Sequence, residues 1–286
     1  MNSLYDKVIV IGYGVVTKDV LETVNVNKDV FGYLTEYVEY EVHPFNLATK
    51  YAVSNDIKHL TIEDIDELSD YFLEEAKRYK LLIISASNNY LFPKALIELD
   101  NVTIINFHNA LLPDYPGRNA PSWVIYNGEK KTGITWHYVS ESVDAGDIIA
   151  QKEIVVDDDM KAYQLSAELM KLAAEAFDEV YSRVLTGDVE TIKQNIDGNA
   201  RKIYKSWEVP ADGFLDLASN VENIYRILRA LDYGKSGIFP PPTAELDGKK
   251  VHINRYKVVA DKDYKDNRLY LNYKDKYLML SYTKLQ

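Results

Sequence analysis

Apolar and polar residues follow two different periods along this chain. Segments of strand length are predicted at residues 7–12, 38–42, 81–85, 102–106, 133–138 and 147–156, and the apolar runs at 7–12 and 81–85 predict buried strands. Apolar residues recur every three or four positions, which predicts helices, over residues 18–24, 61–79, 93–99, 120–126 and 163–185. Because strands and helices alternate, the pattern predicts an α/β fold, with a Rossmann-like, mostly parallel sheet flanked by helices.

The alternation stops shortly after Gly187. One further predicted helix, over residues 221–231, is followed by short β segments separated by turns such as Asp247-Gly248. Tyrosine is frequent in these segments, as it is in half-buried strands. We therefore expect two domains: a catalytic α/β domain over residues 1–187 and a small, mainly β C-terminal domain over residues 188–286.

The composition limits the substrates, the chemistry and the cellular location that can be expected. The formal net charge of -11 repels a phosphate backbone and disfavours a nucleic-acid substrate. The chain has no cysteine, so it can form no disulfide, thiolate zinc site or cysteine nucleophile. No apolar run approaches the roughly 20 residues of a membrane span, and residues 1–7 lack the apolar stretch of a signal peptide. We expect a cytoplasmic protein that does not contact a membrane.

The polar residues best placed for chemistry follow the predicted strand at residues 102–106. Asn106 and His108 stand two positions apart in an extended segment, so both side chains project to one side and can converge on one atom. An amide donor beside an imidazole suits a developing oxyanion. Asp144, in a loop before Gly146, could set the tautomer of His108 or shuttle a proton.

Taken singly, these residues are weak signals. A histidine at a strand end is more often structural, and an aspartate near a glycine is more often a turn residue. Asp147 is a second carboxylate beside Gly146, and we favour Asp144 over it. The other histidines, which are His43, His59, His137 and His252, show no metal-ligand spacing.

The arrangement of residues 106–148 closely resembles the signature of the folate-dependent formyltransferases, a family that includes methionyl-tRNA formyltransferase and the sugar N-formyltransferases. The matching parts are Asn106 and His108, then Leu111-Leu112-Pro113 with Gly117, then Thr132-Gly133, and finally Asp144, Gly146 and Ile148. The resemblance covers residues 7–256, although residues 7–80 are supported only by the pattern of the fold.

The resemblance implies an enzyme that takes a formyl group from 10-formyltetrahydrofolate and gives it to an amine, with Asn106, His108 and Asp144 as catalytic residues and no metal. It also implies that backbone groups in two loops hold the pterin of the folate. The residues implied for folate binding are Tyr90, Leu91, Phe92, Val139, Ser140 and Val143.

Several acceptors remain open at this point. The amine could belong to a nucleotide-linked amino sugar or to an amino-acid derivative; the alternatives are methionyl-tRNA and, after it, water, as in a 10-formyltetrahydrofolate hydrolase. Asn109 and the order Tyr115-Pro116-Gly117-Arg118 depart from many relatives and put the acceptor in doubt.

Other kinds of function are disfavoured. The intact triad argues against a binding module that has lost its catalytic site. The missing third glycine after Gly12 and Gly14 argues against a nicotinamide site. An aromatic strand in the tail could pair two subunits as a homodimer.

Overall fold

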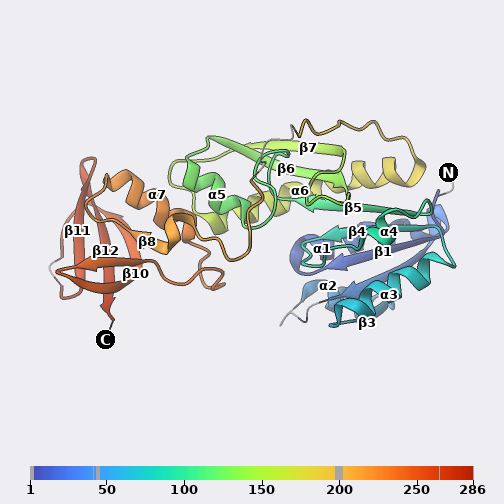
Figure 1. The fold of residues 1–286 in the computed structure, drawn as a ribbon, viewed down its shortest axis with the longest axis horizontal. Coiled ribbons are helices and arrows are strands. Elements are labelled where there is room, and N and C mark those ends of the chain that lie inside the picture. Colours follow the sequence, from blue (N-terminus) through green and yellow to red (C-terminus); the bar gives the residue numbers. More distant parts are fainter. Residues whose placement is uncertain (1–2, 41, 43–45, 197–201, 264, 286) are drawn as a thin grey trace. The chain divides into compact units, whose positions relative to one another are not determined.

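The computed structural model describes residues 3–40, 42, 46–196, 202–263 and 265–285. The chain divides into two compact units, and each contains its own sheet (Figure 1). The first unit combines Met1–Pro116, Gly133–Glu153 and Glu168–Ile203; the second combines Gly117–Thr132, Ile154–Ala167 and Tyr204–Gln286. The domain boundary expected after Gly187 stays a prediction.

The first sheet has the strand order β3-β2-β1-β4-β5-β6-β7 within the described residues. Its strands are β1 (Lys7–Gly12), β2 (Leu34–Glu39), β3 (Lys58–Thr61), β4 (Leu81–Ala86), β5 (Val102–His108), β6 (Lys131–Tyr138) and β7 (Ile148–Val155). The strands from β3 to β5 pair in parallel, and β6 pairs antiparallel to β5. The order reverses after β1, so the carboxyl ends of β1 and β4 lie at a switch point where α/β sheets bind ligands.

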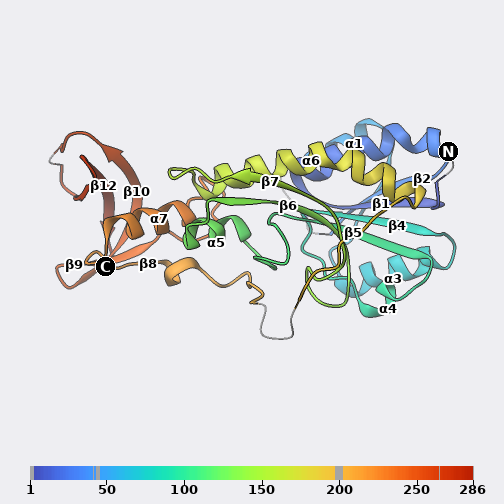
Figure 2. The same ribbon diagram turned by 90° about the horizontal axis from the view of Figure 1, so that it is seen from above.

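Helices cover both faces of this sheet. The helices are α1 (Gly14–Phe31), α2 (Leu47–Ser54), α3 (Ile65–Ala76), α4 (Lys94–Ile97) and α6 (Ala162–Thr186). Figure 2 shows α1 and α6 on one face and α3 and α4 on the other. Ile9 and Ile83, which alternate with residues of the opposite face, pack with Leu68 and Phe72 of α3 in one apolar cluster. The predicted α/β class is therefore confirmed.

Local sequence explains where these helices begin and end. Asp64 precedes α3, and its carboxylate accepts hydrogen bonds from the backbone N–H groups of Asp66 and Glu67. Gly32 follows α1 in the left-handed conformation (φ 74°) and donates its N–H to the Lys28 carbonyl. These caps satisfy backbone groups that have no partner within the helix.

Several expected elements differ in extent. Helix α1 is longer than the expected residues 18–24, and strand β2 lies earlier than the expected residues 38–42. The helix expected over residues 61–79 is shorter, because Thr61 ends strand β3 and α3 begins at Ile65. Neither α2 nor β3 was predicted, since elements of eight and four residues are too short to display a clear period.

The second unit is built on a mainly antiparallel sheet with the order β11-β12-β10-β9-β8. The elements are helix α5 (Ala120–Asn127), the 3-10 helix η1 (Pro210–Gly213), β8 (Phe214–Leu215), α7 (Val221–Leu231), β9 (Thr243–Leu246), β10 (Lys249–Val259), β11 (Arg268–Tyr273) and β12 (Lys276–Lys284). Helix α7 has the predicted bounds, and its residues Ile224 and Leu228 pack against Val251 and Leu278 of the sheet. The expected small, mainly β C-terminal part is confirmed.

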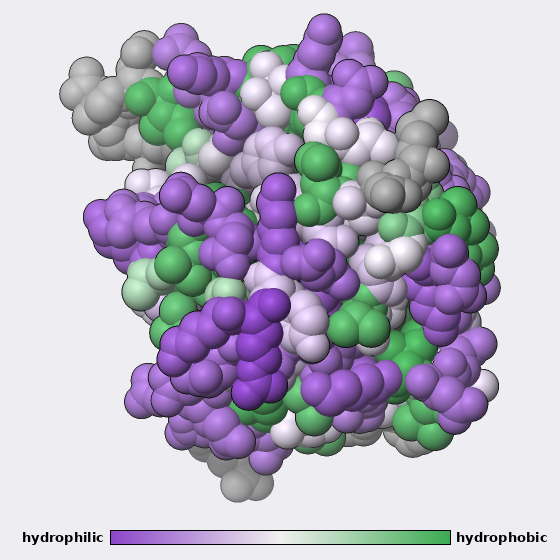
Figure 3. Space-filling model, turned by 90° about the vertical axis from the view of Figure 1, so that its right-hand side faces the viewer, coloured by the Kyte–Doolittle hydropathy of each residue, from purple (hydrophilic) through white to green (hydrophobic). Residues whose placement is uncertain are grey.

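The face of the molecule in Figure 3 is mostly hydrophilic, with hydrophobic residues scattered over it. Scattered apolar residues of this kind are normal on protein surfaces. In the part of the chain that the structure describes, no helix combines the length and the apolar character needed to cross a membrane. The cytoplasmic location stays a prediction.

Candidate active site

Strand β5 delivers Asn106 and His108 to the site. They are two positions apart on an extended strand, as the sequence predicted, and β6 lies antiparallel beside them. The register sets Asn106 opposite His137 and His108 opposite Thr135. Directly opposed residues share one face of a sheet, so all four side chains belong to the same face. The antiparallel pairing of β6 therefore brings a second histidine to the predicted pair.

The loop between β6 and β7 brings Asp144 to the two histidines. One carboxylate oxygen, Oδ2, lies 3.5 Å from Nδ1 of His108, and the other, Oδ1, lies 3.6 Å from Nε2 of His137. The exposed fractions of the three side chains are only 5%, 2% and 12% for His108, His137 and Asp144 respectively. The structure thus brings together all three predicted catalytic residues, and a largely buried carboxylate beside the His108 imidazole can stabilise a positive charge on that ring.

One hydrogen bond of His137 assigns a proton to its Nδ1. Its Nδ1 lies 2.8 Å from the carbonyl oxygen of Tyr138, which can only accept, so Nδ1 carries a proton. In the neutral ring Nε2 is then an acceptor, and it lies 3.1 Å from the amide nitrogen of Asn106. Asn106 therefore donates one of its two amide hydrogens to His137, and the second hydrogen remains for another acceptor. This bond also fixes which end of the Asn106 amide is the donor.

Both ring nitrogens of His108 face acceptors. Nε2 lies 2.9 Å from the carbonyl oxygen of Tyr115, and Nδ1 faces the Asp144 carboxylate. An imidazolium, which donates from both nitrogens, satisfies this arrangement. Tyr115 itself has a left-handed backbone (φ 54°) in the loop after β5. The Tyr115 carbonyl thus accepts a hydrogen bond from the Nε2–H of His108, the N–H that does not face Asp144.

Glycines explain two of the other signature positions. A Cβ on Gly133 would lie 2.0 Å from the carbonyl oxygen of Lys152, and a Cβ on Gly146 would lie 1.8 Å from that of Tyr138. Both distances are far below van der Waals contact, so only glycine allows these backbones to approach.

Thr135 connects the Leu-Leu-Pro turn to β6. Its buried hydroxyl donates a hydrogen bond to the Ala110 carbonyl and accepts one from the Leu112 N–H.

Comparison with known proteins places this geometry in a family. A family model described as formyl transferase matches residues 36–181, just over half of the chain. The chain belongs to the formyl transferase family. That Asn106, His108 and Asp144 are the catalytic residues stays a prediction.

Individual formyl transferases resemble the chain over part of its length. It is 29% identical over 187 residues to the methionyl-tRNA formyltransferase of Clostridioides difficile, covering 65% of this chain and 57% of that protein. It is 31% identical over 172 residues to the GDP-perosamine N-formyltransferase of Brucella melitensis, covering 60% of this chain and 63% of that protein. The chain thus spans about half to three-fifths of the length of the curated relatives it matches.

A solved formyl transferase shares the fold over the full length. The N-formyltransferase of Helicobacter canadensis, solved in complex with folinic acid and dTDP-3-aminofucose, superposes with a TM-score of 0.72 and 17% identity and covers 100% of both chains. At this identity the likeness concerns the fold. It includes the small C-terminal sheet as well as the sheet that carries the triad.

The first loop that the resemblance implies for folate binding contains one residue with a supporting role. Tyr90 is buried, packs edge-on against Phe92 and shares a hydrogen bond of 2.8 Å with the hydroxyl of Ser69. Its backbone N–H and carbonyl both bond to the side chain of Asn88. Leu91, in contrast, has 69% of its surface exposed. The folate assignment of this loop stays a prediction.

The second loop that the resemblance implies for folate binding leads directly to Asp144. Val139 donates its N–H to the Ile104 carbonyl, and the hydroxyl of Ser140 donates to the Ser142 carbonyl at 3.1 Å. Val143 is half-buried beside Asp144. The loop therefore starts from a fixed backbone position on β5, and its folate contacts also stay predictions.

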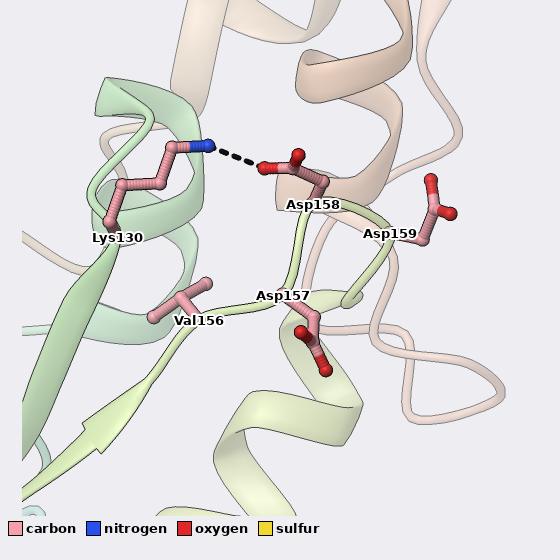
Figure 4. A pocket seen from close by; sticks show the side chains of 5 residues that line it. All are labelled: Lys130, Val156, Asp157, Asp158 and Asp159. Atoms are coloured by element: carbon pink, nitrogen blue, oxygen red, sulfur yellow. Dashed lines mark hydrogen bonds and ion pairs between the residues drawn. The ribbon is translucent and has the colours of Figure 1, made fainter.

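The remaining polar clusters differ from this site. Figure 4 shows a pocket of the second unit lined by Val156 and three consecutive aspartates, with Lys130 paired to Asp158. This ion pair lowers the pKa of the Asp158 carboxyl. None of the predicted site residues lines that pocket. Across the described residues, no group of three or more His, Asp or Glu side chains could hold a metal ion; His43 lies outside those residues.

The sequence interpretation missed His137, which it treated as a histidine without ligand spacing. A lone histidine on a buried strand carries no periodic signal, and its partner Asn106 is 31 positions away. The available signal was the strand predicted at residues 133–138, the next predicted strand along the chain after the one that ends at Asn106. Antiparallel pairing of those two strands would have suggested a cross-strand partner for Asn106.

Proposed function

We propose that this chain transfers a formyl group from 10-formyltetrahydrofolate to the primary amine of a nucleotide-linked amino sugar. The observation that carries the proposal is the meeting of Asn106, His108 and Asp144 at the end of β5 in a member of the formyl transferase family. The names of two relatives, a GDP-perosamine N-formyltransferase and an N-formyltransferase bound to dTDP-3-aminofucose, support the amino sugar.

Asn106 and His108 would stabilise the oxyanion that forms when the amine attacks the formyl carbon. The amide hydrogen of Asn106 that His137 does not use is one donor. The Nε2–H of His108 is the second, once it leaves the Tyr115 carbonyl. One well-placed donor of this type contributes about 3–4 kcal/mol to the stability of the transition state.

The Asp144 carboxylate would keep His108 charged and would help to move a proton. The amine nitrogen first forms a C–N bond to the formyl carbon, which gives the oxyanion; the oxyanion then collapses as the bond from the formyl carbon to the folate nitrogen breaks. In the process the amine loses one proton and the folate nitrogen gains one. The Asp144 carboxylate can accept the amine proton directly or through water, and the charged His108, 3.5 Å away, can give a proton to the folate nitrogen and take one back from Asp144. This reaction needs neither an oxidant nor a covalent bond between the formyl group and the enzyme.

The co-substrate would be held beside the triad by backbone groups of Leu91 and Phe92 and by the loop from Val139 to Val143. The exposure of Leu91 and the partial exposure of this loop are compatible with that role. Tyr90 would fix the position of the first loop, because its side chain is buried and its backbone groups bond to Asn88.

Methionyl-tRNA is the main alternative acceptor, because curated relatives carry that name. The net charge of -11 argues against it, since binding to a phosphate backbone needs clustered basic residues. Hydrolysis of the formyl folate by water is a weaker alternative. A homodimer also remains a prediction; β11, an edge strand of its sheet, is where a second subunit could pair.

The test measures release of tetrahydrofolate from 10-formyltetrahydrofolate with each of several amines. The amines are dTDP- and GDP-linked amino sugars, ornithine derivatives and methionyl initiator tRNA, and a reaction without amine is included. We expect turnover with a nucleotide-linked amino sugar only. Turnover with methionyl-tRNA that falls steeply with salt, or turnover without amine, would refute the amino-sugar proposal.

A further inference from the structure

The segment that follows α6 lies against the Asp144 loop within the first unit. Ile148 and Ile192 exchange two backbone hydrogen bonds, of 2.8 and 2.9 Å. Two residues farther on, the side-chain amide of Gln194 lies 3.0 Å from the carbonyl oxygen of Asp144 and 2.7 Å from that of Gly146. A single NH₂ group, which has two hydrogens, thus donates to both carbonyls.

These two bonds act on a stretch of loop with unusual backbone geometry. Asp144 has a left-handed conformation (φ 50°), which is uncommon for residues other than glycine. Gly146 packs so closely on the Tyr138 carbonyl that no side chain fits. A left-handed residue persists where surrounding contacts hold it, and Gln194 bonds to the carbonyls on both sides of Ala145.

Of the two polar atoms of the Gln194 side chain, only the NH₂ group makes hydrogen bonds within the described residues. Its other amide atom, Oε1, is buried and has no hydrogen-bond partner within the described residues. Burying an amide oxygen without a partner is unfavourable. The residue therefore carries a cost that its two N–H bonds to the loop offset.

We propose that Gln194 is a positioning residue for the formyl transfer: it holds the Asp144 backbone so that the carboxylate stays between His108 and His137. This inference rests on the proposed function for its kinetic part. Gln194 acts through Asp144, since both of its hydrogen bonds go to loop carbonyls. It also makes the segment before residue 197 part of the site, although that segment lies beyond the catalytic domain expected from the sequence.

The decisive variant is Gln194→Glu, which keeps the size of the side chain but replaces both N–H donors with a carboxylate. We expect kcat to fall about 10- to 100-fold, with KM for both substrates changed less than about twofold. Gln194→Lys restores N–H donors and should recover at least part of kcat. Gln164→Glu, an exposed glutamine of α6, is the matched control and should leave kcat unchanged.

A second readout separates this inference from the proposed function. The imidazole nitrogens of His108 and His137 can be observed by long-range ¹H–¹⁵N NMR, because the chain has only five histidines. We expect both rings to shift in Gln194→Glu and not in Gln164→Glu, whether or not any amine is formylated. If Gln194→Glu unfolds, Gln194→Leu takes its place, with unfolding followed by circular dichroism.

Three results would overturn the inference. One is unchanged kcat together with unchanged imidazole signals in the donor-free variant. Another is equal loss of kcat in Gln194→Glu and Gln194→Lys. The third is a change confined to KM. Absence of formyl transfer in the wild-type protein with every amine would refute the proposed function alone, and the NMR comparison would still decide the role of Gln194.

Discussion

The side-chain amide of Asn106 lies 3.1 Å from Nε2 of His137, and the antiparallel register of β5 and β6 sets the two residues directly opposite each other. Because the Nδ1–H of His137 is bonded to the Tyr138 carbonyl, Nε2 accepts from Asn106. His137 thereby orients the amide whose remaining hydrogen is the proposed oxyanion donor. The relationship makes His137 a positioning residue that can be tested separately from the triad.

Replacing His137 should reveal this orienting bond. His137→Leu removes the acceptor and should lower kcat by about tenfold or more, because Asn106 loses its fixed orientation. His137→Gln supplies an acceptor oxygen near the position of Nε2 and should retain most of the activity. The measurement is kcat and KM for both substrates. Equal kcat in the two variants would show that His137 only fills space.

The proposed catalytic roles of His108 and Asp144 predict a specific kinetic pattern. His108→Ala or Asp144→Ala should lower turnover by roughly a hundredfold or more while folate affinity stays largely intact. Tetrahydrofolate release and equilibrium binding of a folate analogue measure the two quantities. Asp147→Ala is the matched control and should keep near wild-type turnover. Normal turnover in both triad variants would refute the assignment.

A methyl group at Gly146 should displace the Asp144 loop. Gly146→Ala would place Cβ 1.8 Å from the Tyr138 carbonyl oxygen, so the backbone has to move and kcat should fall at least tenfold. Gly14→Ala serves for comparison: Gly14 has a positive φ of 83° but open space around it. That substitution should cost about 1–2 kcal/mol of stability from the backbone conformation and leave kcat largely unchanged. Unfolding midpoints and kcat of both variants check the contrast.

A buried ion cluster should make the stability of the first unit depend on acid pH. Lys7 pairs with Glu36 and Glu75, and all three side chains are at most 10% exposed. Burial by itself raises the pKa of Glu36, but hydrogen bonds from Lys7, Tyr71 and Lys58 outweigh it, and the net pKa lies below the ordinary value of 4.5.

Since the folded-state pKa of Glu36 is the lower one, its charged form stabilises the fold above pH 4.5, and this contribution is lost as the pH falls through the folded-state value. We expect the thermal midpoint to drop as the pH falls below about 4.5, and to drop less in Glu36→Gln. Lys7→Met, which leaves two buried carboxylates without their shared cation, should cost about 3–5 kcal/mol at neutral pH. An identical pH slope in Glu36→Gln would contradict this account.

Much of the fold and part of the site could be predicted from local patterns. The buried runs at residues 7–12 and 81–85 coincide closely with β1 and β4, and residues 221–231 form α7, because the apolar period of each segment matches its own burial. The convergence of Asn106 and His108 follows from the two-residue repeat of a strand and needs no knowledge of the rest of the chain.

The tertiary structure decided what depends on residues distant in sequence. Asn106 meets His137 across 31 positions, and Gln194 meets the Asp144 carbonyl across 50. The short elements α2 and β3 likewise owe their form to packing against neighbours, since neither is long enough to be stable alone. The sequence by itself determined the class of fold and the reactive residue types; strand register and loop contacts determined which side chains orient them, because hydrogen bonds depend on distances in space that no local period encodes.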